Sequence, residues 1–139
     1  MKSLSVKLGV ILIGLAIFGY TEVWGADWKL FVTDTKTIGY FDAESITRPS
    51  KDIVKVWIKC EYTDNGVTGT VEELGKKYEN TVETTALQEI NCSDKKRRTL
   101  SLTHYSKKGK VLYTSSHAGE WNDVIKKSIW EGLCEAVCK

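Results

Sequence analysis

The chain has 139 residues and a formal net charge of +2, with 27% charged and 42% hydrophobic residues. This balance creates no overall field that would attract nucleic acid or a membrane surface. The length suits one domain with its own core, and neither an internal repeat nor a low-complexity linker divides it.

The first 25 residues have the three-part pattern of a secretory signal peptide. Two lysines are followed by an apolar run at 8–20. As a helix this run would be about 20 Å long, too short for a bilayer core of about 30 Å, so an uncleaved anchor is the weaker alternative. Val23 and Gly25 supply the small side chains that signal peptidase requires, which predicts cleavage after Gly25. We therefore expect an exported domain, periplasmic or secreted, over 26–139.

Alternating side chains predict strands in the first half of this domain. Segment 28–32 reads as a strand, 38–46 as a strand with a bend, and 48–52 as a turn around its proline. The clearest strand is 53–62, whose two faces are Val54, Val56, Ile58, Cys60 and Tyr62 on one side and Lys55, Trp57, Lys59 and Glu61 on the other. One apolar and one charged face indicate a sheet that is covered on one side only.

The second half continues with strands and turns. Segment 64–69 reads as a loop, and Thr70 with Glu73 matches a capping box that predicts a short helix. Strands are expected at 86–92, 99–105 and 110–116, and SKKG at 106–109 is typical of a hairpin turn between the last two.

The chain closes with an amphipathic helix of about three turns. Ser128 and Glu131 form a second capping box at its start. The apolar stripe consists of two adjacent rows, Ile129, Leu133 and Val137, and Trp130, Cys134 and Cys138. A helix this short is marginal in water, so we expect it to dock on the apolar face of strand 53–62.

Four cysteines, Cys60, Cys92, Cys134 and Cys138, in an oxidising compartment allow three pairings. We favour Cys92–Cys138 with Cys60–Cys134, and the swapped pairing ranks next. A Cys134–Cys138 bond ranks last, because it would constrain only one helical turn. A bond that closes a loop of about 46 residues is worth roughly 4 kcal/mol in the chain-entropy model.

The sequence contains no clear motif for metal binding, redox chemistry, haem attachment, lipid attachment or catalysis. The cysteine spacing does not suit structural zinc, and neither a C-x-x-C redox motif nor a C-x-x-C-H haem motif occurs. No cysteine precedes Cys60, so lipid attachment at a processed N-terminal cysteine is not expected. Asp42 and Glu44 could share a strand face, but no nucleophile motif such as G-x-S-x-G is present. We therefore expect no enzymatic activity, no metal and no cofactor.

Two sets of residues are candidates for binding. Trp57 between Lys55 and Lys59, together with Arg97 and Arg98 of the basic run KKRR, forms a candidate protein-binding surface; a solvated turn is the plainer interpretation of that run. His104 and His117 are weak candidate ligands of a haem. His104 alternates with Leu100 and Leu102, which favours a packed histidine instead.

Several short patterns, in a consistent order from Trp28 to Cys138, resemble the bacterial surface-adhesin protein E family. They are YFDAESI (40–46), VKVWIK (54–59), EINC (89–92) followed by Arg98 and Leu100, Tyr105, GKV (109–111), and Trp121 leading to Ser128 and Val137-Cys138. The resemblance implies an α+β fold in which an antiparallel sheet of about six strands holds a C-terminal helix to one face through a Cys92–Cys138 disulfide.

The family's founding member is a lipid-anchored adhesin that binds host matrix and serum proteins and has been associated with haem. This chain departs from that pattern: it has no lipidation cysteine, it carries KKS at 126–128 where Pro-Gly-Ser is usual, and Cys60 and Cys134 look like an extra pair. We expect an exported, non-enzymatic protein-binding module. A small-ligand binder, for example for haem, and an inhibitor of a hydrolase such as a lysozyme are the alternatives.

Overall fold

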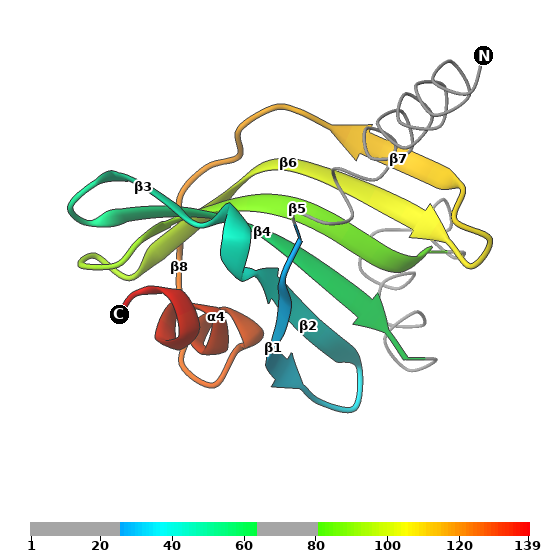
Figure 1. The fold of residues 1–139 in the computed structure, drawn as a ribbon, viewed down its shortest axis with the longest axis horizontal. Helices are drawn as coiled ribbons and strands as arrows, with labels where there is room; N and C mark the ends of the chain where they lie inside the picture. Colours follow the sequence, from blue (N-terminus) through cyan, green and yellow to red (C-terminus); the bar gives the residue numbers. More distant parts are fainter. Residues whose placement is uncertain (1–25, 64–80) are drawn as a thin grey trace, which may run out of the picture.

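The structure, a computed structural model, describes residues 26–63 and 81–139. Eight strands of these residues form one antiparallel sheet (Figure 1). They are β1 (Trp28–Thr33), β2 (Thr37–Asp42), β3 (Thr47–Ser50), β4 (Ile53–Tyr62), β5 (Thr81–Asn91), β6 (Lys96–Ser106), β7 (Val111–Ser115) and β8 (Asn122–Asp123). The order is β1-β2-β4-β5-β6-β7, with β3 beside β4 and β8 beside β6. A 3₁₀ turn, η1 (Ala43–Ser45), and the helix α4 (Ile129–Val137) complete the described elements.

The predicted antiparallel sheet and C-terminal helix are confirmed, but six strands is an undercount. Strand β3 covers Thr47–Ser50, where Pro49 had indicated a turn, and the turn follows at Lys51 and Asp52 instead. Proline has no backbone donor and is tolerated only at a sheet edge, which is where the short β3 lies. Strand β8 has two residues, too few for alternation to reveal.

Three sequence predictions lie outside the described residues. They are the signal peptide at 1–25, the loop at 64–69 and the capping box of Thr70 and Glu73. Within 26–63 and 81–139, no helix has the length and apolarity needed to cross a membrane.

Strand β4 is the centre of the sheet, and its predicted alternation is confirmed. Val54, Val56, Ile58 and Cys60 are all at most 5% exposed, whereas Trp57 is 39% exposed. Both β2 and β3 pair with one edge of β4, at 58–62 and 53–55. In the gap between them the Ser45 hydroxyl accepts the Trp57 backbone N–H at 2.9 Å. The edge therefore changes partner without leaving that donor unpaired.

Strands β5 and β6 extend the same inner face. Ala86 and Ile90 lie opposite Ile58 and Val54 and are buried. The register of β5 against β6 shifts between Leu87 and Gln88, as in a β-bulge. Because of this shift Gln88 pairs with Thr99, and the alternation expected from Leu100 through His104 does not continue unbroken to the start of β6.

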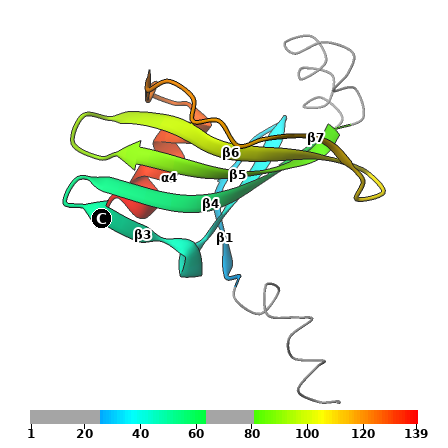
Figure 2. The same cartoon turned by 90° about the horizontal axis from the view of Figure 1, so that it is seen from above.

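Helix α4 lies on one face of β4, β5 and β6, and the described residues place no α-helix on the opposite face (Figures 1 and 2). Its predicted N-cap is confirmed, since the Ser128 hydroxyl accepts the Glu131 N–H at 3.4 Å. The Glu131 carboxylate accepts the N–H of Lys127 at 3.1 Å rather than that of Ser128. Leu133 and Val137 are at most 1% exposed, so the predicted docking of the stripe is also confirmed.

Phe31 in β1 packs against two glycines from distant parts of the chain. A Cβ atom at Gly39 in β2 would lie 2.7 Å from the Phe31 ring, so only a glycine leaves room for that ring. A Cβ at Gly132 in α4 would lie 3.1 Å from the Phe31 carbonyl oxygen. Strand β1 and helix α4 therefore approach each other closely at Phe31.

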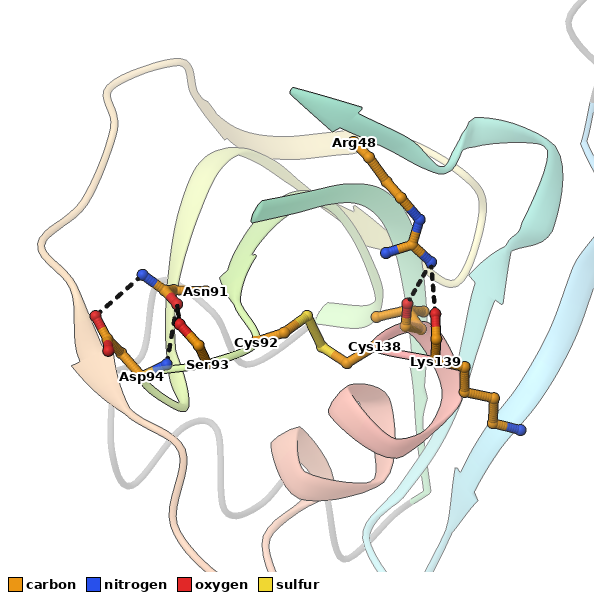
Figure 3. The surroundings of a disulfide bond; sticks show 8 residues. Arg48, Asn91, Cys92, Ser93, Asp94, Cys138 and Lys139 are labelled. Carbon is orange, nitrogen blue, oxygen red and sulfur yellow. Dashed lines mark hydrogen bonds between the residues drawn. A yellow bond between two sulfur atoms is a disulfide. The ribbon is translucent and has the colours of Figure 1, made fainter. Parts of the chain in front are cut away.

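A disulfide joins the end of α4 to the sheet (Figure 3). Cys92, which follows β5, is bonded to Cys138, and their Cα atoms are 5.7 Å apart. From β3, the Arg48 guanidinium donates to the carbonyl oxygens of Val137 at 3.0 Å and Lys139 at 3.4 Å. The Cys92–Cys138 bond predicted from the sequence is confirmed.

The second predicted bond, Cys60–Cys134, is wrong, because both cysteines are buried and free. The Cys92 N–H donates to the Asp52 carbonyl at 2.8 Å, which places the existing disulfide beside the start of β4. Cys60 lies about 25 Å further along that strand. Cys134 lies only one turn, about 6 Å, from Cys138. The two sulfurs are therefore too far apart to bond, since bonded cysteines have Cα atoms within about 7 Å.

Candidate functional site

The outer face of the sheet, opposite α4, carries the predicted Trp57, Lys55 and Lys59. A cavity of about 570 Å³ opens there, lined by Ala26, Trp28, Asp42, Trp57, Thr85, Thr103 and Tyr105. Thr85 and Thr103 are paired across β5 and β6, and these short side chains form the floor. Trp57 and Tyr105 lie on the same face, one on each side of this threonine pair along the strands. We call this surface the aromatic trough.

Lys59 connects the trough to β1 and β2. Its ammonium nitrogen lies 4.8 Å from the centroid of the Trp28 ring and 5.1 Å from that of Tyr40. Both distances are within the range of a cation–π interaction. The sequence analysis predicted a strand at 28–32 but gave Trp28 no part in a binding surface. The side chains of Trp28 and Leu30 are 37% and 55% exposed, which shows an outward orientation.

The two candidate arginines lie on opposite faces, so the predicted basic surface is divided. Arg98 is on the outer face, where its Nε donates to the Glu89 carboxylate at 2.7 Å and its guanidinium lies 4.7 Å from the Trp121 ring. Arg97 is on the inner face, with its guanidinium carbon 3.6 Å from the centroid of the Trp130 ring of α4. Consecutive strand residues point to opposite faces, so a run of basic residues in a strand does not make one patch.

A second cavity, of about 290 Å³, lies on the inner face beside the first turn of α4; we call it the inner cavity. Its lining comes from β2, β4, β5, β6 and α4: Thr37, Ile58, Cys60, Tyr62, Thr84, Ala86, Gln88, Arg97, Thr99, Leu102, His104, Ile129 and Trp130. Of these residues only Arg97 carries a permanent charge. The site combines apolar walls with a few convergent polar groups, as small-molecule sites do.

A chain of hydrogen bonds crosses one end of the inner cavity. The Tyr62 hydroxyl donates to Thr84 Oγ1 at 3.0 Å, and Thr84 Oγ1 lies 2.7 Å from His104 Nδ1. If the threonine proton is donated onward, the His104 ring is protonated at Nε2. Burial raises the pKa of Tyr62 to about 12 and lowers the pKa of His104, so both groups are neutral near pH 7.

The packed interpretation of His104 is confirmed, since that residue is 7% exposed. His117 is exposed in the segment after β7. The haem hypothesis for either histidine stays a prediction. Within the part of the chain that the structure describes, no group of three or more His, Cys, Asp or Glu residues could hold a metal ion.

Two polar atoms at the inner cavity are buried without a hydrogen-bond partner among the described residues. They are Gln88 Oε1 and Arg97 Nε. Gln88 is 1% exposed, and its Nε2 donates to Thr99 Oγ1 at 2.8 Å. A buried polar atom without a partner costs about 1–3 kcal/mol. Each of these two atoms carries a cost of that order unless a further molecule pairs with it.

The predicted carboxylate pair has a structural explanation. Asp42 Oδ1 accepts the backbone N–H of Asp27 at 2.7 Å and that of Glu44 at 3.0 Å. The Asp42 carboxylate thus caps η1 and orients the chain before β1. Glu44 is exposed, and the Asp42–Glu44 contact passes through the backbone rather than through two facing carboxylates.

Comparison with known proteins gives one family. The family model described as surface-adhesin protein E matches residues 28–139. Among solved structures, the crystal structure of protein E from non-typeable Haemophilus influenzae is similar, with 13% sequence identity, a TM-score of 0.49, and coverage of 80% of this chain and 74% of that chain. No curated protein matches the sequence.

Proposed function

The chain belongs to the surface-adhesin protein E family, and from this premise we propose that it is an exported, non-enzymatic module that binds an extracellular protein. The aromatic trough is the proposed contact surface. Exposed aromatic side chains beside basic residues are enriched at protein interfaces, and tryptophan and tyrosine are frequent among the residues that dominate binding energy.

The observation that carries the proposal is the exposure of large aromatic side chains around a cavity on the face of the sheet that no described helix covers. Trp28 and Trp57 are 37% and 39% exposed. Tryptophan side chains are on average well buried in folded proteins, so two exposed ones on the same surface suggest a contact with another molecule. Lys59 adds a positive charge that contacts the rings of Trp28 and Tyr40. This arrangement suits a protein segment with apolar side chains and a nearby carboxylate.

Binding of the purified domain 26–139 to immobilised extracellular matrix proteins tests the proposal. We expect Trp57→Ala to weaken binding at least tenfold, because truncating a central aromatic anchor typically costs 2 kcal/mol or more. Lys59→Gln should weaken it less and should reduce its dependence on salt concentration. Surface plasmon resonance at two salt concentrations measures both effects.

Trp121→Ala is the matched control, since Trp121 is similarly exposed at 36% but lies at Arg98 rather than in the trough. Its binding should match that of the unmodified domain. Equal losses in both tryptophan variants, or none in Trp57→Ala, would exclude the trough as the contact surface.

Export is tested on the same protein. Expression with residues 1–25 in a bacterial host, followed by cell fractionation and mass spectrometry, should recover a periplasmic or secreted chain that begins at Ala26. The hydrolase-inhibitor hypothesis stays a separate prediction, which inhibition assays against lysozymes and trypsin-like proteases test.

A further inference from the structure

We propose that the inner cavity is a binding site for a small monocyclic carboxylate. The cavity is a site distinct from the aromatic trough, because the two are on opposite faces of the sheet. The inference therefore does not rest on the proposed adhesin function.

The charge of the cavity selects the ligand class. Arg97 lines it and makes no salt bridge with a described residue, whereas Arg98 next to it is paired with Glu89 at 2.7 Å. The Arg97 guanidinium carbon lies 3.6 Å from the centroid of the Trp130 ring, a cation–π contact that does not use the N–H donors of the guanidinium. A planar guanidinium matches a carboxylate through paired hydrogen bonds. One such cation balances one carboxylate, and among the described lining residues there is no second cation to balance a doubly charged phosphate.

Gln88 defines a second contact point. Gln88 lines the cavity, its Nε2 is fixed by Thr99, and its buried Oε1 has no hydrogen-bond partner among the described residues. Because this oxygen has almost no accessible surface, a ligand hydroxyl or N–H would reach it only with a small shift of the surrounding side chains. The Tyr62 hydroxyl already donates to Thr84, so it offers the ligand an acceptor rather than a donor.

The walls between these polar points are apolar. Ile58 and Leu102 come from the sheet and Trp130 from the helix. The cavity, of about 290 Å³, lies at the small end of the usual range of roughly 300–1,000 Å³ for ligand sites. A single ring fits these dimensions. The Cys60 thiol in the same wall is unreactive, because burial raises its pKa to about 11, so we expect reversible binding.

The test uses the domain 26–139 labelled with ¹⁵N and titrated with 4-hydroxyphenylacetate and 4-hydroxybenzoate. Either probe should shift the side-chain NH₂ signals of Gln88 and the indole N–H signal of Trp130 in a saturable manner. Methyl 4-hydroxyphenylacetate keeps the ring and hydroxyl but has no charge. It should bind the unmodified domain about tenfold more weakly than the acid, since the charge-assisted bonds to Arg97 are lost.

Arg97→Gln should weaken binding of the acid by a similar factor and leave binding of the ester unchanged. Lys96→Gln is the matched control, because it removes an adjacent positive charge whose partner is the exposed Asp123, and it should bind the acid normally. Comparison of acid and ester on the unmodified domain needs no variant and remains decisive if Arg97→Gln fails to fold. Equal affinities of acid and ester, or no saturable shift with either acid at millimolar concentration, would overturn the proposal and indicate a cavity filled by water.

Discussion

The two faces of the sheet are built from the same strands but differ in what covers them. On the inner face, Val56 and Ile58 of β4 are buried under α4 and neighbouring side chains. On the outer face, Trp57 of the same strand is 39% exposed, although it lies opposite Leu87 of β5. The inner face holds the fold together, and among the described residues no helix covers the outer face, where we propose that a partner protein binds.

Each face also contains one exception to this division. The outer face has the Glu89–Arg98 pair, whose glutamate is 8% exposed. The inner face has the cavity at Gln88 and Arg97, where apolar packing is incomplete. Exceptions to a simple hydrophobic pattern are where function is expected, and the inner cavity is the less obvious of the two, because no exposed patch marks it.

The largest expected loss of stability comes from removing the disulfide that links helix α4 to the sheet. Replacing Cys92 and Cys138 by serine together removes a cross-link between residues 46 apart in sequence, worth roughly 4 kcal/mol in the chain-entropy model. The free energy of unfolding from urea denaturation should fall by about that amount. A change below about 1 kcal/mol would show that packing alone holds α4 in place.

Adjacent residues of β4 give a direct comparison of the faces. Ile58 is 2% exposed, so Ile58→Ala should lower the free energy of unfolding by about 2–5 kcal/mol. Trp57→Ala, on the exposed face, should lower it by about 1 kcal/mol or less. Urea denaturation of both variants checks this difference. Similar losses would mean that the outer face also has a stabilising role.

The Glu89–Arg98 pair is expected to give a smaller loss. Arg98→Leu leaves the Glu89 carboxylate, whose side chain is 10% exposed, without its partner. A fully buried pair would lose 3–5 kcal/mol on removal of one partner. Because the Arg98 side chain is 31% exposed, solvent reduces this to about 2 kcal/mol. A double-mutant cycle with Glu89→Leu should recover part of the loss, and additivity of the two changes would contradict a direct interaction.

The smallest expected effect is a pH dependence from the inner face. Burial lowers the pKa of His104 below its ordinary value of 6.5. The unfolded chain then binds more protons than the folded chain at pH values between the two pKa values. Stability should therefore be full above pH 6.5 and should fall as the pH drops through that interval. Urea denaturation between pH 7.5 and 5 should show this fall, which His104→Gln should remove.

The sequence predicted strands well where one face is buried. In β4, side chains alternate between core and solvent without interruption, so the pattern identified its bounds and its inner residues. The C-terminal helix was predicted for the same reason, together with its Ser128 cap. Short strands such as β3 and β8 contain too few residues for periodicity to appear.

The candidate site was predicted only in part. Trp57 and its flanking lysines could be assigned to the outer face from β4 alone. The role of Trp28 and Tyr40 depends on pairing between β1, β2 and β4, which sequence spacing does not contain. The inner cavity depends on the bulge between Leu87 and Gln88 and on where α4 stops covering the sheet, and both are properties of the packed structure.

The Cys60–Cys134 error has the same origin. Both residues were correctly assigned to the buried face, but being on one face does not fix position along it. The register of Cys92 against Asp52 sets that position, and it puts Cys60 out of reach. Local periodicity predicts which face of a strand or helix a side chain lies on. The distance between two residues depends in addition on how strands and helices that are remote in sequence pair with each other.

Phe31 has a consequence for how the domain tolerates change. Its ring fills the space of the missing side chain at Gly39, and its carbonyl oxygen touches the helix backbone at Gly132. An added methyl group at position 39 would displace the ring, and the displacement would reach α4 through the same residue. Residues 31, 39 and 132 should therefore vary together across related sequences, because a substitution at any one of them changes the packing at the other two.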